Sequence, residues 1–121
     1  MKLTDLEIWK KSRMFRNDIS ALSKSFPDHE RYKLKDQIVR SSRSVTANIA
    51  EGHGGYHYQE NIQFCRTARG SLVETFDHLT VALDEKYLTE HDFSKLIPLH
   101  EELMKMINGY ITYLKKRKSE G

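Results

Sequence analysis

The chain has 121 residues, of which 38% are hydrophobic and 31% are charged, so its length fits one domain rather than several. Two prolines and six glycines argue against a loop-rich or all-β chain, and a single cysteine excludes a disulfide framework within one chain. Lys and Arg number 20 against 17 Asp and Glu, and the net charge of +3 permits a nucleic-acid partner without requiring one. No apolar run approaches a membrane span and the start lacks a signal-peptide core, so we expect a soluble cytoplasmic protein.

The first predicted helix begins at Thr4, because Thr4 and Glu7 have the spacing of a capping box. Apolar residues then recur at helical intervals, with Ser12 in the one polar slot. The helix should end before Pro27, since the residue that precedes a proline avoids the α region. Its apolar stripe consists of Ile8, Phe15, Ile19, Leu22 and Phe26.

Asp28 is the predicted N-cap of the second helix, and Gly52 is its predicted C′ residue, since glycine adopts a left-handed conformation without penalty. Small side chains are dense between residues 41 and 50, so a neighbouring helix can approach closely there. The stripe of this helix consists of Leu34, Ile38, Ser41 or Ser42, Val45 and Ile49.

The third helix is predicted from about Tyr58 to Lys86, a stretch without proline. Gly70 lies inside it at a cost of about 1 kcal/mol relative to alanine, which a close helix crossing would explain. The stripe, the most regular in the chain, consists of Cys65, Ala68, Leu72, Phe76, Leu79 and Leu83.

The fourth helix is predicted to begin at Thr89, with Asp92 three residues further on. Pro98 either kinks this helix or restarts it as a first-turn proline. Residues 115–118 are all cations, which are favourable near a helix C-terminus. The stripe consists of Phe93, Leu96, Leu99, Leu103, Ile107, Tyr110 and Leu114.

Four helices joined by short connections predict an all-α fold, an antiparallel up-down-up-down four-helix bundle. We expect one domain over residues 1–121, with a basic C-terminal tail at 115–121. Further apolar residues lie beside the stripes of the second and third helices. A helix that is apolar on more than one side needs a second partner, so we expect self-association. These flanking residues are Val39, Ile62, Phe64, Val73 and Val81.

Residues 37–52 resemble the signature of the four-helix-bundle proteins related to the 23S rRNA intervening-sequence protein. Residues 6–10, 26–27 and 68–74 resemble the opening, first turn and third helix of that family, in the same order, and the resemblance covers roughly residues 3–115. It implies an antiparallel four-helix bundle that assembles as a homopentamer. Some relatives are encoded inside insertions of the 23S rRNA gene. A distant relative accompanies the reverse transcriptase of diversity-generating retroelements, and nucleic-acid binding through a basic surface is attributed to it.

Two arginine pairs are the first candidates for nucleic-acid contact. Arg40 and Arg43 lie three residues apart on the second predicted helix. Arg66 and Arg69 have the same spacing on the third, so each pair shares one helix face. If the two helices are neighbours, the pairs could form a guanidinium patch suited to phosphate oxygens. The alternative is ion pairing with Glu51, Glu60, Glu74 or Asp77.

The first predicted helix carries the largest basic excess of the chain. Lys10, Arg13 and Arg16 step by three and share a side of it. They form either a strip that tracks phosphates or an ordinary solvated face. The complete set of predicted nucleic-acid-binding residues is Lys10, Arg13, Arg16, Arg40, Arg43, Arg66 and Arg69.

The remaining chemically interesting residues have simpler explanations. Histidines and tyrosines at 53–58 can stack on unpaired RNA bases or pack at the start of the third helix. Residues 54–56 stand where relatives often carry basic residues, which argues against a phosphate contact at that turn. Cys65 is expected as an apolar filler, and Trp9 as a core or subunit contact. No acidic residue lies three positions before a histidine, as a di-metal bundle requires.

These observations favour a non-enzymatic oligomeric binding module that contacts RNA or DNA through basic helix faces. The alternative is a homo-oligomeric protein–protein scaffold, or an accessory protein, that binds no nucleic acid. The resembling family has no established catalytic residues to carry over. We therefore expect no catalytic residue, metal, cofactor, small-molecule substrate or membrane partner.

Overall fold

The computed structural model describes residues 1–121 and contains four long helices, two short 3-10 helices and no strands. The predicted all-α class with four helices is confirmed. No helix combines the length and the hydropathy that a membrane span requires. The elements in chain order are η1 (Leu3–Asp5), α1 (Glu7–Ser23), η2 (Asp28–Glu30), α2 (Leu34–Gly54), α3 (Tyr58–Asp84) and α4 (Glu90–Glu120).

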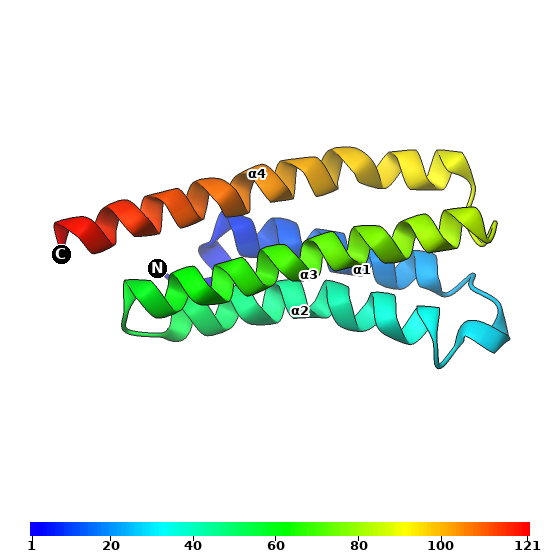
Figure 1. The fold of residues 1–121 in the computed structure, drawn as a ribbon, viewed down its shortest axis with the longest axis horizontal. Coiled ribbons are helices and arrows are strands. Elements are labelled where there is room, and N and C mark those ends of the chain that lie inside the picture. Colours follow the sequence, from blue (N-terminus) through cyan, green and yellow to red (C-terminus); the bar gives the residue numbers. More distant parts are fainter.

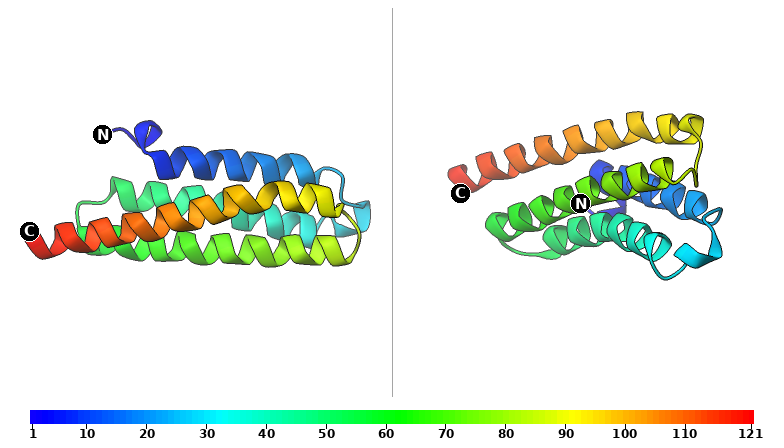
Figure 2. Two further views of the ribbon diagram at one scale, coloured as in Figure 1. Left: turned by 90° about the horizontal axis from the view of Figure 1, so that it is seen from above. Right: turned by 45° about the vertical axis from the view of Figure 1, so that its right-hand side comes forward.

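The chain turns back between consecutive long helices (Figure 1). The α1–α2 and α3–α4 connections lie at one end of the molecule, and the α2–α3 connection lies at the other end with both termini (Figures 1 and 2). α2 packs against α1 and α3, and α4 packs against α3 and α1. The four helices therefore surround one shared core, and the α1/α2 and α3/α4 seams lie on different sides of it.

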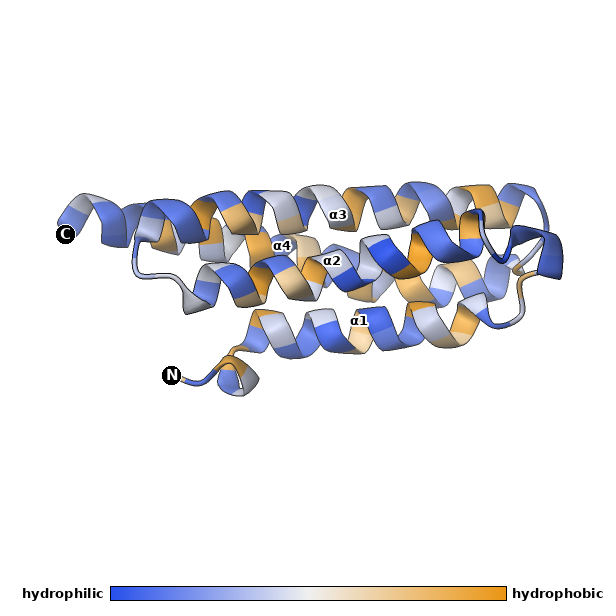
Figure 3. Cartoon of the chain, turned by 90° about the horizontal axis from the view of Figure 1, so that it is seen from below, coloured by the Kyte–Doolittle hydropathy of each residue, from blue (hydrophilic) through white to orange (hydrophobic).

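The core consists of twenty buried apolar residues, and every long helix contributes to it. Figure 3 shows hydrophobic segments recurring at intervals along each helix. Phe15, Ile38, Leu72 and Leu103, one from each helix, are fully buried. The predicted stripes are confirmed as the core-facing sides. One flanking residue was misplaced: Ile62 is only 2% exposed and belongs to the core, because it faces inward one turn before Cys65.

Small polar side chains bring α2 and α3 together, as their density in the sequence predicts. The hydroxyls of Ser41 and Thr75 lie 2.8 Å apart, and those of Ser44 and Ser71 lie 2.9 Å apart. Thr75 also donates to the Ser71 carbonyl in its own helix, at 2.8 Å. Serine and threonine side chains are small, and here their hydroxyls hydrogen-bond to one another. The two helices can therefore approach closely without burying an unpaired polar group.

The predicted starts of the first two helices are wrong. Thr4 lies in η1, and the N-cap of α1 is Leu6, whose side chain packs on the core instead of capping. Asp28 lies in η2, and α2 begins six residues later. Between them lies Glu30, whose carboxylate accepts from the Leu34 amide at 3.5 Å. The same carboxylate accepts from the Tyr87 hydroxyl at 2.9 Å, an interaction that raises the pKa of Tyr87 to about 12.

The predicted end of α2 is also wrong, because the helix continues through Gly52 to Gly54. Gly52 is buried, and no glycine in the chain has a positive φ, so its role is close packing rather than a left-handed turn. A Cβ at Gly52 would collide with the Asn61 side chain and would lie 3.1 Å from the Phe64 Cβ. The left-handed residue that ends α3 is Lys86, with φ 63°.

Three features of α3 and α4 resolve open expectations. Thr89 caps α4 as predicted, since its side chain accepts from the Asp92 amide at 3.1 Å. α4 runs through Pro98 as one helix, so the proline does not restart it. The close crossing expected at Gly70 is absent, because a Cβ there would meet nothing within 4 Å.

Candidate nucleic-acid interface

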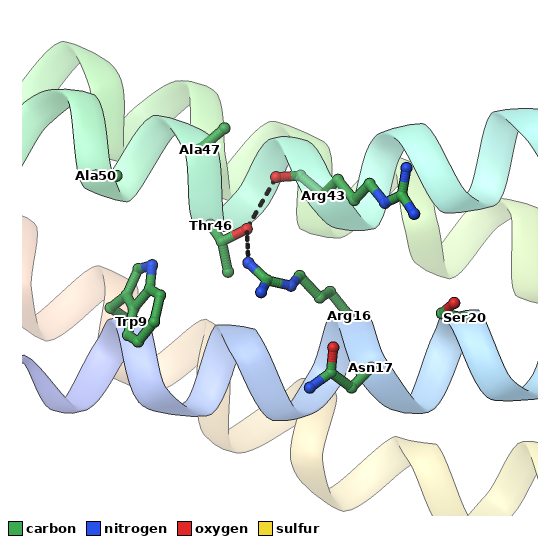
Figure 4. A pocket seen from close by; sticks show the side chains of 8 residues that line it. All are labelled: Trp9, Arg16, Asn17, Ser20, Arg43, Thr46, Ala47 and Ala50. Carbon is green, nitrogen blue, oxygen red and sulfur yellow. Dashed lines mark hydrogen bonds between the residues drawn. The ribbon is translucent and has the colours of Figure 1, made fainter. Parts of the chain in front are cut away.

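A groove of about 490 Å³ runs along the seam between α1 and α2 (Figure 4). We call it the α1/α2 groove. It is open because α2 presents small side chains there, while α1 presents long polar ones and an indole ring. Its lining residues are Trp9, Arg16, Asn17 and Ser20 from α1, and Arg43, Thr46, Ala47 and Ala50 from α2.

Thr46 positions Arg16 inside this groove. The Thr46 hydroxyl oxygen accepts from Arg16 Nη1 at 3.0 Å and donates to the Arg43 carbonyl at 3.0 Å (Figure 4). Thr46 is only 3% exposed, so the contact holds the guanidinium against the wall of the groove. A guanidinium carries five N–H donors, and this bond uses one of them. The others remain available to a ligand.

Arg43 lines the same groove from α2, where its side chain runs along the helix (Figure 4), and its guanidinium has no hydrogen-bond or ion-pair partner within the chain. None of the eight lining residues is an aspartate or glutamate. Two guanidiniums that share a groove without a carboxylate create a positive field, which an anion would relieve. The groove therefore has the charge and the donors to bind phosphate oxygens.

The other predicted residues of α1 lie outside the groove. The Arg13 guanidinium stands over the Trp9 ring, 5.7 Å from its centroid, at the groove's rim. Lys10 points away and forms an exposed ion pair with Glu7, with 3.3 Å between Nζ and Oε1. Of the three cations that step along α1, one lines the groove, one flanks it through Trp9, and one lies on the solvated face.

The predicted grouping of the α2 and α3 arginines is wrong. Arg43 lies on the α1 side of α2, whereas Arg69 lies on the α4 side of α3 and donates to Asn108 Oδ1 at 2.8 Å. Arg40 pairs with Asp36 at 3.5 Å, in place of the acidic residues proposed from the sequence. The facing sides of α2 and α3 carry hydroxyl residues, and Arg43 and Arg69 lie along two different seams.

Arg66 lines a second basic groove, between α3 and α4. Lys115 and Lys118 line it too, and Lys118 donates to Gln59 Oε1 on α3. Again no carboxylate is among the lining residues. The sequence predicts these two lysines only as favourable charges near a helix C-terminus, and it does not predict the groove. The signal that could have found it is their i, i+3 spacing on the side of α4 that carries Ile111 and Leu114.

The residues with potential for other chemistry are occupied or buried. Cys65 is fully buried, as predicted, and burial raises the pKa of its thiol to about 11. His53 Nε2 lies 3.0 Å from the Met1 carbonyl oxygen, and His57 is the extended N-cap of α3. No three His, Cys, Asp or Glu side chains gather where they could hold a metal ion.

Comparisons with known proteins identify the chain's relatives. A crystal structure of a protein of unknown function from the S23 ribosomal protein family of Bacteroides thetaiotaomicron matches this fold with a TM-score of 0.79. The two sequences are 24% identical, and the match covers 86% of this chain and 97% of that one, which shows a shared fold. No curated protein matches the chain. Residues 4–109 match the model of a family described as 23S rRNA-intervening sequence protein, and the chain belongs to that family.

Proposed function

We propose that this protein is a non-enzymatic nucleic-acid-binding module whose α1/α2 groove holds phosphates of RNA or DNA. The observation that carries the proposal is the pair of guanidiniums, Arg16 and Arg43, that line one groove with no carboxylate beside them. Arginine side chains match phosphate geometry and need no covalent chemistry to act. Membership in a family described by its 23S rRNA intervening sequence supports a nucleic acid as the polyanion.

The remaining predicted residues have unequal parts in this proposal. Arg13 flanks the groove and extends its positive field. Arg66 and Arg69 lie along the α3/α4 seam, where Lys115 and Lys118 add to them as a separate basic surface. Lys10 and Arg40 are exposed and paired within α1 and α2, and we propose that they contribute only long-range attraction. The contacts are sequence-independent, because guanidinium–phosphate bonds carry no base information.

Self-association is the second part of the proposal. We take the chain as an antiparallel up-down-up-down bundle that assembles into a homo-oligomer, a pentamer by resemblance. Its support is the outer face of α3, where Val73 is 54% exposed and Val81 is 38% exposed. The exposure of these apolar side chains to water costs free energy, and contact with a neighbouring copy would remove that cost. In a ring of copies the net charge of +3 per chain adds up. The exposed Val73 and Val81 also favour the alternative function, a scaffold that binds only protein.

A charge-matched pair of variants tests the groove. Arg16→Ala/Arg43→Ala removes its two guanidiniums, and Lys24→Ala/Arg31→Ala removes two exposed cations in the connection between α1 and α2. We expect only the first variant to bind labelled RNA more weakly. The slope of log affinity against log salt should fall by about 1.4 to 1.8, the share of two phosphate contacts. Equal losses in the two variants, or binding that ignores salt, would overturn the proposal.

A further inference from the structure

Trp9, the chain's single tryptophan, stands at one end of the α1/α2 groove (Figure 4). Part of its side chain packs on the core, and the rest of the ring lines the groove. Across the groove α2 presents Ala47 and Ala50, which are too short to cover it. The Arg13 guanidinium lies over the ring, 5.7 Å from its centroid. The indole is therefore held in place beside open space.

Phosphate binding alone does not account for this ring. Arginine side chains suffice to hold a phosphate. An indole that is partly exposed to water costs free energy, which a polar residue at position 9 would avoid. An aromatic ring next to guanidiniums is instead the combination that holds a nucleotide, because the base stacks while the phosphate is neutralised. A base paired inside a duplex offers no free face, so only an unpaired base can stack on the ring.

We propose that the α1/α2 groove binds one unpaired nucleotide, with its base against Trp9 and its phosphate on Arg16 and Arg43. This inference rests on the proposed function and adds the class of ligand, which is single-stranded nucleic acid. Ala47 and Ala50 are then small because the base occupies the space in front of them. Thr46 serves the site indirectly, since it orients the Arg16 guanidinium toward the phosphate position.

The fluorescence emission of Trp9, the single tryptophan, measures whether a base stacks on the ring. The full chain is titrated with a short single-stranded RNA, with the same strand annealed to its complement, and with inorganic polyphosphate. We expect the single strand to quench Trp9 emission, because a stacked base quenches indole. The duplex and polyphosphate should bind in a salt-dependent way and leave the emission unchanged.

Two variants separate stacking from packing. Trp9→Leu keeps an apolar contact with the core and removes the ring, and it should lower single-strand affinity roughly tenfold with no loss of duplex binding. Trp9→Tyr should restore most of that affinity. Ala47→Leu fills the groove from the exposed side of α2, so it should abolish quenching in a chain that keeps its tryptophan. Helix content and unfolding midpoint are measured for each variant.

The outcomes distinguish this inference from the proposed function. If single strand and duplex bind equally with salt dependence and neither quenches Trp9, the inference is overturned and the proposed function stands. If no probe binds with salt dependence, both fail. If Trp9 emission shifts with protein concentration and ignores RNA, the groove is covered by a second copy of the chain, and the nucleotide site is overturned.

Discussion

α2 presents small side chains to two neighbours, and the two seams they form are different. Toward α3, Ser41 and Ser44 meet hydroxyls of the other helix, and the seam closes through short hydrogen bonds. Toward α1, Ala47 and Ala50 face an indole and long polar side chains, and a groove remains. Small residues on one helix therefore close a seam only where the partner is small as well. The closed seam stabilises the fold, and the open seam leaves room for a ligand.

The largest effect should come from forcing the closed seam apart. Gly52→Ala places a Cβ against Asn61 and the Phe64 Cβ, so one or both helices must shift, at a cost of about 2 kcal/mol. Gly54→Ala is the matched control, because a Cβ there meets nothing within 4 Å. Urea unfolding of both variants measures the difference in free energy. Equal stability of the two variants would show that the α2/α3 approach is looser than described.

The hydroxyl pair in the same seam gives the next effect. Thr75→Val removes the closer partner of the buried Ser41 hydroxyl, which keeps its longer bond to the Ile38 carbonyl of its own helix, at 3.2 Å. The free energy of unfolding should fall by about 1 kcal/mol. Adding Ser41→Ala should recover part of that loss, since no buried hydroxyl then faces the apolar valine side chain. Thr67→Val, which removes only a bond to its own exposed helix, is the control. Strictly additive losses in the double variant would contradict a coupled pair.

The core-facing side of each helix could be predicted from sequence, because burial follows the helical period of the side chains. The helix ends could not, because they depend on contacts between distant residues. Glu30, just before α2, binds Tyr87, 57 positions later, and no local pattern in the sequence indicates that contact. Gly52 looks like a helix terminator in the sequence, and only the approach of Asn61 shows that it is a packing residue.

The sequence predicts the individual residues of the candidate site but not which of them lie together. A three-residue spacing shows that Arg40 and Arg43 share a face of one helix, but it does not show which neighbour that face meets. The other arginine that lines the groove with Arg43 is Arg16. Arg16 is held by a hydrogen bond to Thr46, which lies 30 positions later in the sequence. Such a pairing depends on the rotation of two packed helices, which periodicity does not determine.

The α3/α4 side adds a titratable ring that neither seam of α2 contains. His100 packs on Phe76 with 4.9 Å between ring centroids, and its Nε2 lies 3.3 Å from the Leu72 carbonyl oxygen. Burial lowers the pKa of His100 below its ordinary value near 6.5, against the smaller opposing effects of that carbonyl and of Glu101. The unfolded chain then binds the proton more readily than the folded chain.

Stability should therefore be fully present above the ordinary histidine pKa and decline as pH falls through that value toward the lower folded one. The decline should be smaller than the two losses above, because His100 is only partly buried. His100→Gln can still donate to the Leu72 carbonyl and does not titrate, so it should flatten this part of the profile. Unfolding midpoints across mildly acidic pH measure the effect, and an unchanged slope in the variant would assign it to another histidine.

The smallest effect on stability should come from the open seam. Ala47→Leu adds an exposed side chain to the α1/α2 groove, and we expect unfolding free energy to change by no more than about 0.5 kcal/mol. The same change should weaken RNA binding, because it occupies the space beside Trp9. A residue whose replacement costs binding and spares folding is what a site requires, whereas Gly52 in the closed seam should behave in the opposite way. If Ala47→Leu destabilises the chain as much as Gly52→Ala, the groove is a packed contact, and the contrast between the two sides of α2 disappears.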